Sequence, residues 1–273
     1  MNIELAVDEI DGASGKRIFI FLHGILGRGG NLRSIARQFI EARPDWTAWL
    51  VDLRGHGRST KSGPGPSLEA AAGDLANLAV SAKLPLGAIV GHSLGGKVAL
   101  EAARIGAIPS LEHVVVIDSA PGSRPPFHAS DSALAVIETI ESLPRTFSSK
   151  STFIEALIAR GQTPIVAQWL AQSVEREGDH VRFALDLDEI RALILDYFAR
   201  DLWPVVERPP DALRVHLVIG DRSDSYSTAD RNRALQIAAS NERVTVDVLP
   251  AGHWVHVDDP DGLLRVLVHR VND

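Results

Sequence analysis

The chain has 273 residues, and its 28 lysines and arginines against 35 aspartates and glutamates give a formal net charge of −7. A mildly acidic chain without a long basic run argues against nucleic acid or an anionic membrane as its main partner. Cysteine is missing, which excludes disulfides, thiolate metal sites and cysteine nucleophiles. The acidic N-terminus does not resemble a signal sequence and no apolar run approaches about 18 residues, so we expect a cytoplasmic protein.

Along the chain, short apolar runs rich in β-branched residues alternate with longer stretches at helical spacing. This alternation is typical of an α/β fold, in which helices cover a parallel sheet. The expected strands are Ile3–Asp8, Arg17–Leu22, Thr47–Asp52, Ala88–Gly91, His113–Asp118, Arg214–Ile219 and Val244–Leu249. The helices expected between them are Asn31–Glu41, Ser67–Lys83, Leu94–Ile105, Asp230–Ser240 and Gly262–Val271.

The alternation breaks between Ser123 and Pro210, where we find helical patterns and no convincing strand. Prolines bracket this segment at Arg124–Pro126 and Arg208–Pro210, as expected of stiff exits from a domain. We therefore expect residues 1–122 and 211–273 to form the core, and residues 123–210 to form a helical cap over the strand ends. The helices expected in the cap are Ser132–Ser142, Ser151–Arg160, Ile165–Glu175 and Leu187–Phe198. We expect the aromatic residues of this segment mainly to pack the cap onto the core; the alternative is that one or two of them line a substrate pocket. These residues are Phe147, Phe153, Trp169, Tyr197, Phe198 and Trp203.

The sequence Gly91-His92-Ser93-Leu94-Gly95 lies between an apolar run and a helical stretch. Glycines two residues away on each side allow the serine to occupy a strained strand-to-helix turn, where neighbouring side chains would collide with the backbone. Such a turn exposes the hydroxyl at the carboxyl end of the sheet. The pattern predicts Ser93 as a nucleophile.

A serine hydroxyl needs a base within hydrogen-bond reach, and the base needs a carboxylate. His253 follows the last expected strand, at the same sheet edge as Ser93, and is the predicted base. We expect His256 to pack or to cap the final helix. Asp118 ends one strand and Asp224 follows the next, so either carboxylate gives the chain order serine, acid, histidine, and spacing alone leaves both open.

The oxyanion of an acyl-transfer reaction needs two backbone donors. One is predicted to be the N–H of Leu94, directly after the nucleophile. The other is predicted to be the N–H of Ile25, in the glycine-rich loop after the strand that ends at Leu22. We expect His23 to brace this loop, because the loop must be rigid to aim an N–H group.

Four separated motifs together resemble those of the α/β-hydrolase superfamily: HGILG at 23–27, DLRGHGRS at 52–59, GHSLGGK at 91–97 and AGHWVH at 251–256. The resemblance implies a mostly parallel sheet of eight strands with a helical cap inserted after the sixth. It also implies that the loop of Arg54 and His56 is structural.

The chain is more closely similar to small serine esterases that carry GHSxGGK followed by DxAP, here at Asp118–Pro121. This resemblance implies that Asp118 is the triad acid. More typical superfamily members carry the acid at the position that is Ser223 here, so the chain departs from the common pattern at this point.

The function that these residues predict is hydrolysis of a small carboxylic ester through an acyl-enzyme, without a cofactor or a metal. His253 and His256 have no third ligand at a spacing that suits zinc. Thioesters, lactones and carbon–carbon bonds remain alternative substrates on this fold, and a receptor that binds a ligand with little turnover is an alternative of another class. The oligomeric state is left open.

Overall fold

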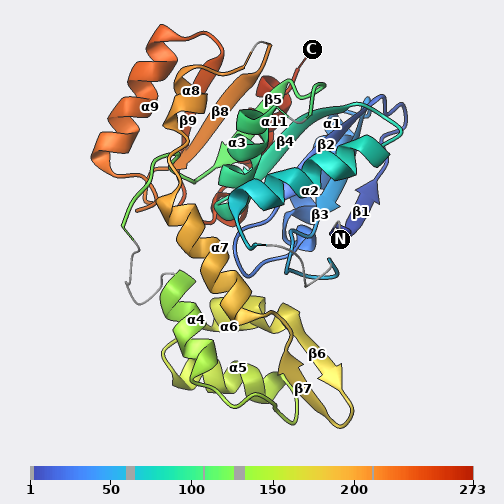
Figure 1. Cartoon of the computed structure of the whole chain (residues 1–273), viewed down its shortest axis with the longest axis vertical. Helices are drawn as coiled ribbons and strands as arrows, with labels where there is room; N and C mark the ends of the chain where they lie inside the picture. Colours follow the sequence, from blue (N-terminus) through green and yellow to red (C-terminus); the bar gives the residue numbers. More distant parts are fainter. Residues whose placement is uncertain (1–2, 60–64, 107, 126–132, 211, 273) are drawn as a thin grey trace.

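Seven strands form the main sheet of the computed structural model, which describes residues 3–59, 65–106, 108–125, 133–210 and 212–272 (Figure 1). Their order is β1-β3-β2-β4-β5-β8-β9, and every neighbouring pair is parallel except β1 with β3. The strands are β1 (Val7–Ile10), β2 (Arg17–Leu22), β3 (Trp46–Val51), β4 (Leu86–His92), β5 (His113–Ile117), β8 (Arg214–Gly220) and β9 (Val244–Leu249).

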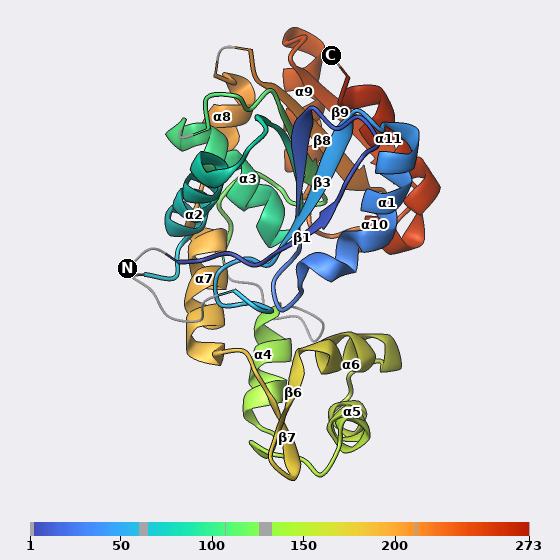
Figure 2. The same cartoon turned by 90° about the vertical axis from the view of Figure 1, so that its right-hand side faces the viewer.

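The central strands are buried on both faces. In β2, Phe19 and Phe21 point into one apolar layer, and Ile18, Ile20 and Leu22 point into the other. One layer is covered by α1 (Arg33–Ala42) and α11 (Pro260–Arg270), and the other by α2 (Leu68–Ser81), α3 (Leu94–Ile105) and α9 (Thr228–Ser240) (Figure 2). The α/β class expected from the sequence is confirmed.

The count of eight strands implied by the resemblance is not met, because the described main sheet has seven. The expected strand Ile3–Asp8 begins only at Val7. Before that residue, the backbone of Ala6 is held by a loop: its N–H donates to Ser59 Oγ at 2.8 Å, and its carbonyl accepts from the N–H of Asp52 at 3.0 Å. Ala6 and Asp52 continue the register of the Val7–Val51 pair, so the second bond still belongs to the ladder. Pairing ends because Ser59 Oγ accepts from the N–H of Ala6 and donates to the carbonyl of Asp52, in place of a direct bond between them.

A long segment is inserted between β5 and β8. Its elements are α4 (Ala133–Glu141), α5 (Lys150–Ala159), α6 (Pro164–Leu170), β6 (Val174–Glu177), β7 (His180–Phe183), α7 (Leu187–Ala199) and α8 (Trp203–Glu207). Elements α4 to β7 form a separate body, α7 runs from it to the core, and α8 lies against the core beside α9 (Figure 1). Two residues named in the expectations for this segment lie outside the described residues: Pro126 of the first proline stretch and Ser132, the first residue of the expected helix Ser132–Ser142.

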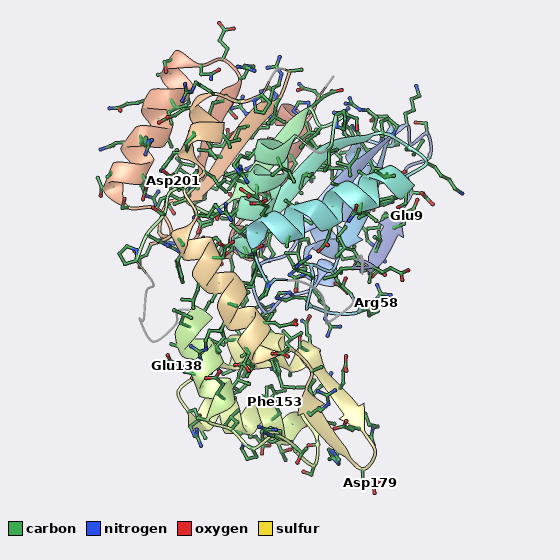
Figure 3. The ribbon with its side chains drawn as sticks, in the orientation of Figure 1. Glu9, Arg58, Glu138, Phe153, Asp179 and Asp201 are labelled. Atoms are coloured by element: carbon green, nitrogen blue, oxygen red, sulfur yellow. The ribbon has the colours of Figure 1, made fainter. Side chains whose placement is uncertain are left out.

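The expectation of a helix over Ile165–Glu175, with no strand in the segment, is wrong. The helix ends at Leu170, a short 3-10 turn follows at Ala171–Ser173, and β6 and β7 form an antiparallel hairpin. Its two-residue turn is Gly178-Asp179, with Gly178 at φ 61°, a left-handed conformation that glycine adopts without strain. Figure 3 shows Asp179 at the tip of this hairpin and Phe153 inside the inserted body.

Lys97 joins the inserted segment to the core. Its side chain is buried on α3, and Nζ donates to the carbonyls of Gly122, Tyr197 and Arg200 at 2.7–2.8 Å. These three acceptors satisfy the three donors of an ammonium group. The last residue of the GHSLGGK motif therefore holds together the entry and the exit of the inserted segment.

Candidate active site

Ser93 occupies the turn between β4 and α3 in a strained backbone conformation, with φ 50° and ψ −114°. A Cβ on Gly91 would lie 2.1 Å from the backbone of Gly95, and a Cβ on Gly95 would lie 2.6 Å from the carbonyl of Leu22. Both positions therefore require glycine. The N–H of Ser93 donates to the carbonyl of Ile117 at 3.0 Å, which ties the turn to the end of β5.

Asp118 follows β5 directly and is fully buried. One carboxylate oxygen, Oδ2, lies 2.7 Å from His253 Nδ1, and the other accepts from the N–H of Gly220 at 3.0 Å. Ser223 donates its hydroxyl to Oδ2 as well. Asp224 is exposed and makes no hydrogen bond with His253. Of the two carboxylates that the sequence left open, the structure places Asp118 against the histidine.

His253 lies in the loop after β9 and is held from two sides. Its Nδ1 is shared between Asp118 and Ser225, whose Oγ lies 2.9 Å away. His92 Nε2–H donates to the carbonyl of His253 at 2.9 Å, and the two rings lie 4.7 Å apart. Because Ser93 is the next residue after His92, this bond ties the loop of His253 to the turn that carries Ser93. In this structure His253 is not hydrogen-bonded to Ser93 itself, which is common in unliganded hydrolases.

The two predicted oxyanion donors lie on segments that meet at Ser93. Leu94 is the first residue of α3, where a backbone N–H has no acceptor within the helix. On the other segment, a Cβ on Gly24 would lie 3.5 Å from the Cβ of Ser93, so the loop that contains Ile25 packs directly on the nucleophile.

Two buried histidines brace this loop reciprocally. His23 Nε2 accepts from the N–H of Leu53, and His56 Nε2 accepts from the N–H of Leu26, which sits at φ 62°. A ring nitrogen that accepts carries no proton, so each proton is on Nδ1, where it is donated to the carbonyl of Gly24 or of Arg54. Burial lowers the pKa of His23 to about 4 and that of His56 to about 3, which keeps both rings neutral.

Sequence reasoning missed three residues that surround the base. They are His92, Ser223 and Ser225. No spacing rule marks His92 or Ser225, and the family pattern marks Ser223 only as the position where typical members carry the acid. His256, expected to pack, lies 4.9 Å from His92 between ring centroids, and burial lowers its pKa to about 4.

The inserted segment contacts the core at two further points. Trp169 of α6 packs on Trp254, next to the base, with 5.3 Å between rings, and Gln172 accepts from Asn31 Nδ2 at 3.1 Å. A cavity of about 310 Å³ lies near the second contact, and its lining does not include Ser93. Four of the other aromatic residues of the segment have buried side chains, as expected of residues that pack the cap: Phe153, Tyr197, Phe198 and Trp203.

The described part of the chain contains no group of three or more histidine, aspartate or glutamate side chains placed to bind a metal ion. None of the helices in that part combines the length and the apolar character needed to cross a bilayer.

Comparison with known proteins places the chain in a family. The model of the alpha/beta hydrolase family matches residues 19–266. The chain is 26% identical over 263 residues to the sn-1-specific diacylglycerol lipase ABHD11 of Danio rerio, covering 94% of this chain and 79% of that protein. It is 25% identical over 258 residues to Esterase YbfF of Escherichia coli K12, covering 93% and 92%. A solved structure described as a marine microorganism esterase has a TM-score of 0.82 at 23% identity, covering 98% and 99%. The chain belongs to the alpha/beta hydrolase family.

Proposed function

We propose that this protein is a serine hydrolase that cleaves carboxylic esters, with Ser93 as nucleophile, His253 as base and Asp118 as the acid of the triad. The observation that carries the proposal is the 2.7 Å contact between the buried Asp118 carboxylate and His253 Nδ1, at the sheet edge where Ser93 occupies its strained turn. The lipase and esterase relatives support ester hydrolysis as the reaction.

The reaction proceeds in two steps. Ser93 Oγ attacks the ester carbonyl carbon while His253 Nε2 takes its proton, and the N–H groups of Ile25 and Leu94 stabilise the oxyanion. As the tetrahedral intermediate collapses, the bond to the alcohol breaks and His253 returns the proton to the leaving oxygen. Water, deprotonated by the same ring, then attacks the acyl-enzyme, and the free acid leaves as Ser93 regains its proton.

The surroundings of Asp118 suit its role in this scheme. Its oxygens accept from Gly220 and Ser223, so the carboxylate is fixed in direction before the reaction begins. A fixed and buried negative charge stabilises the imidazolium that forms when His253 takes a proton.

We also propose that residues 123–210 act as a cap that shapes the acyl pocket. Trp169 on Trp254 and Gln172 on Asn31 hold this segment close to the base and to the oxyanion loop. Action in the cytoplasm on a small-molecule ester stays a prediction of the sequence.

Hydrolysis of p-nitrophenyl esters of increasing acyl length tests the proposed function. We expect sustained multiple turnover, and a loss of about 10⁴- to 10⁶-fold in kcat for Ser93→Ala. A single stoichiometric burst without turnover would indicate a ligand-binding receptor instead. Matched thioesters and lactones belong in the same series, and a preference for either would replace the ester as the substrate class.

A further inference from the structure

The loop after β8 supports the base with a residue that the proposed triad does not contain. Ser225 Oγ lies 2.9 Å from His253 Nδ1, and Asp118 Oδ2 lies 2.7 Å from the same nitrogen. The buried carboxylate is an acceptor, so Nδ1 carries a proton that is directed at Asp118. Ser225 Oγ is then a second acceptor of the same N–H group, in a three-centre hydrogen bond. Two side chains therefore hold the imidazole ring in its direction.

Core contacts fix this loop on both sides of Ser225. Before it, the carbonyl of Ser223 accepts from Arg231 of α9 at 2.7 Å. After it, the buried Tyr226 donates its hydroxyl to the carbonyl of Ser119, next to the acid, at 2.9 Å. Ser225 itself is half-buried between these two anchors. The place of its hydroxyl therefore depends on what holds its own backbone.

The backbone of Ser225 is held by a guanidinium from the start of the inserted segment. Arg124 Nη1 donates to the carbonyl of Ser225 at 3.1 Å. In the described part of the chain, the backbone of Ser225 makes one further hydrogen bond, from its N–H to Ser223 Oγ at 3.1 Å. Because Ser223 belongs to the same short loop, Arg124 is the contact that fixes Ser225 from outside the loop.

Arg124, in the chain that leaves β5, takes its position from the end of α7 nearest the core (Figure 1). Its N–H donates to the carbonyl of Phe198 at 2.9 Å, and its guanidinium lies over the Phe198 ring, 5.2 Å from the centroid. That end of α7 is itself fixed, because the carbonyl of Tyr197 accepts from the buried Lys97 of α3 at 2.7 Å. Contacts therefore run without a break from α7 through Arg124 and Ser225 to the base.

We propose that Arg124 and Ser225 are positioning residues for the base: Arg124 holds the backbone of Ser225, and the Ser225 hydroxyl keeps the Nδ1–H group of His253 directed at Asp118 while Nε2 transfers the proton of the reaction. Both residues act through His253. The stem of the inserted segment thereby contributes to kcat, in addition to any contact of that segment with substrate. This inference rests on the proposed ester hydrolase function and adds how the inserted segment controls its base.

Steady-state kinetics with p-nitrophenyl butyrate test this relay of Arg124, Ser225 and His253. We expect Ser225→Ala to lower kcat about tenfold and Arg124→Leu about fivefold, with KM changed less than about twofold in both variants. Because Arg124 acts through the Ser225 hydroxyl, adding Arg124→Leu to Ser225→Ala should lower kcat no further. Ser225→Thr keeps the hydroxyl and Arg124→Lys keeps a cationic donor, so each should restore part of the loss.

Arg145→Leu and Ser81→Ala are the controls. Arg145 is exposed in the inserted segment, and the Ser81 hydroxyl bonds to a carbonyl of its own helix α2, so both variants should keep normal kcat. Losses that multiply in the double variant of Arg124 and Ser225 would overturn the inference while leaving the esterase intact. A raised KM with normal kcat in either single variant would do the same.

Nuclear magnetic resonance gives a second readout that needs no turnover. If no ester is hydrolysed, the proposed function fails, and spectra of histidine-labelled protein then decide the relay separately. The ring nitrogen signals of His253 are identified by their loss in His253→Gln. Ser225→Ala and Arg124→Leu should both move the Nδ1 signal in the same direction, and Arg145→Leu should leave it in place. An Nδ1 signal that does not move in Arg124→Leu would overturn the inference by this route.

Discussion

Ser223 donates its hydroxyl to the buried carboxylate of Asp118, from the loop position at which more typical members of this superfamily carry the acid. In the proposed triad the carboxylate therefore comes from the loop after β5, and the loop after β8 supplies a hydroxyl that supports it. Because both loops lie at the carboxyl ends of neighbouring parallel strands, either loop can bring an oxygen to the same ring nitrogen. Four predictions follow from this arrangement and its surroundings.

Asparagine at position 118 should lower kcat for p-nitrophenyl butyrate by about 10⁴-fold, because an amide neither stabilises the imidazolium nor fixes its tautomer. Asp224→Asn is the control, since Asp224 is exposed and not bonded to His253. Steady-state rates of the two variants decide the assignment. Near-normal turnover by Asp118→Asn, with loss of activity in Asp224→Asn, would reverse it.

Alanine at position 223 should reduce kcat by about three- to tenfold, since it removes one hydrogen bond to a charged acceptor and leaves Asp118 less firmly oriented. Ser240→Ala is the matched control, because that hydroxyl bonds only to carbonyls of its own helix α9. The same assay compares the two variants. Equal activity in both would show that Ser223 does not orient the acid.

Leucine at position 92 should lower kcat about tenfold with little change in KM, because the buried His92 ring holds the backbone of His253 in place. His92→Gln keeps an N–H donor and should restore part of the loss. Separate determination of kcat and KM is required. An increase in KM with normal kcat would assign His92 to substrate binding.

Acid should unfold this protein steeply below pH 6.5. The pKa is lowered, chiefly by burial, in His23, His56, His92, His113, His216 and His256. The unfolded chain therefore binds more protons than the folded chain between pH 6.5 and about 4, and stability falls as pH falls through that range. Each histidine contributes a slope of up to about 1.4 kcal/mol per pH unit.

Urea unfolding at pH 7.5, 6.0 and 5.0 measures this slope. His216→Gln should flatten it, because burial and the neighbouring His113 lower the pKa of His216 to about 3. His269→Gln, at an exposed position, controls for the substitution itself. A free energy of unfolding that does not change between pH 7.5 and 5.0 would contradict the prediction.

The strand-to-helix turn could be predicted from the sequence because its requirements are local. Gly91 and Gly95 are demanded by atoms within a few residues of Ser93 and by the adjacent end of β2. The choice between Asp118 and Asp224 could not be made from neighbouring residues, because it depends on which of the two side chains its loop directs toward His253. Residue spacing carries no information on that direction.

The hairpin of the inserted segment was missed for a related reason. The strand Val174–Glu177 is polar and mostly exposed, so its pattern continues that of the preceding helix. Only the Gly178-Asp179 pair marks the turn. The role of Lys97 was equally hidden, because two of its three acceptors lie about 100 residues further along the chain.

The entry and exit of the inserted segment run as a pair: Leu202 N–H donates to the carbonyl of Pro121, and Arg124 N–H donates to that of Phe198, both at 2.9 Å. A cut at Arg124 and Phe198 therefore leaves two ends one hydrogen bond apart, which a short turn can close, while α8 still carries the crossover to β8. If the inserted segment shapes the acyl pocket as proposed, its exchange between relatives is expected to carry acyl preference with it, provided that the exchanged segment keeps the Tyr197 carbonyl that accepts from Lys97.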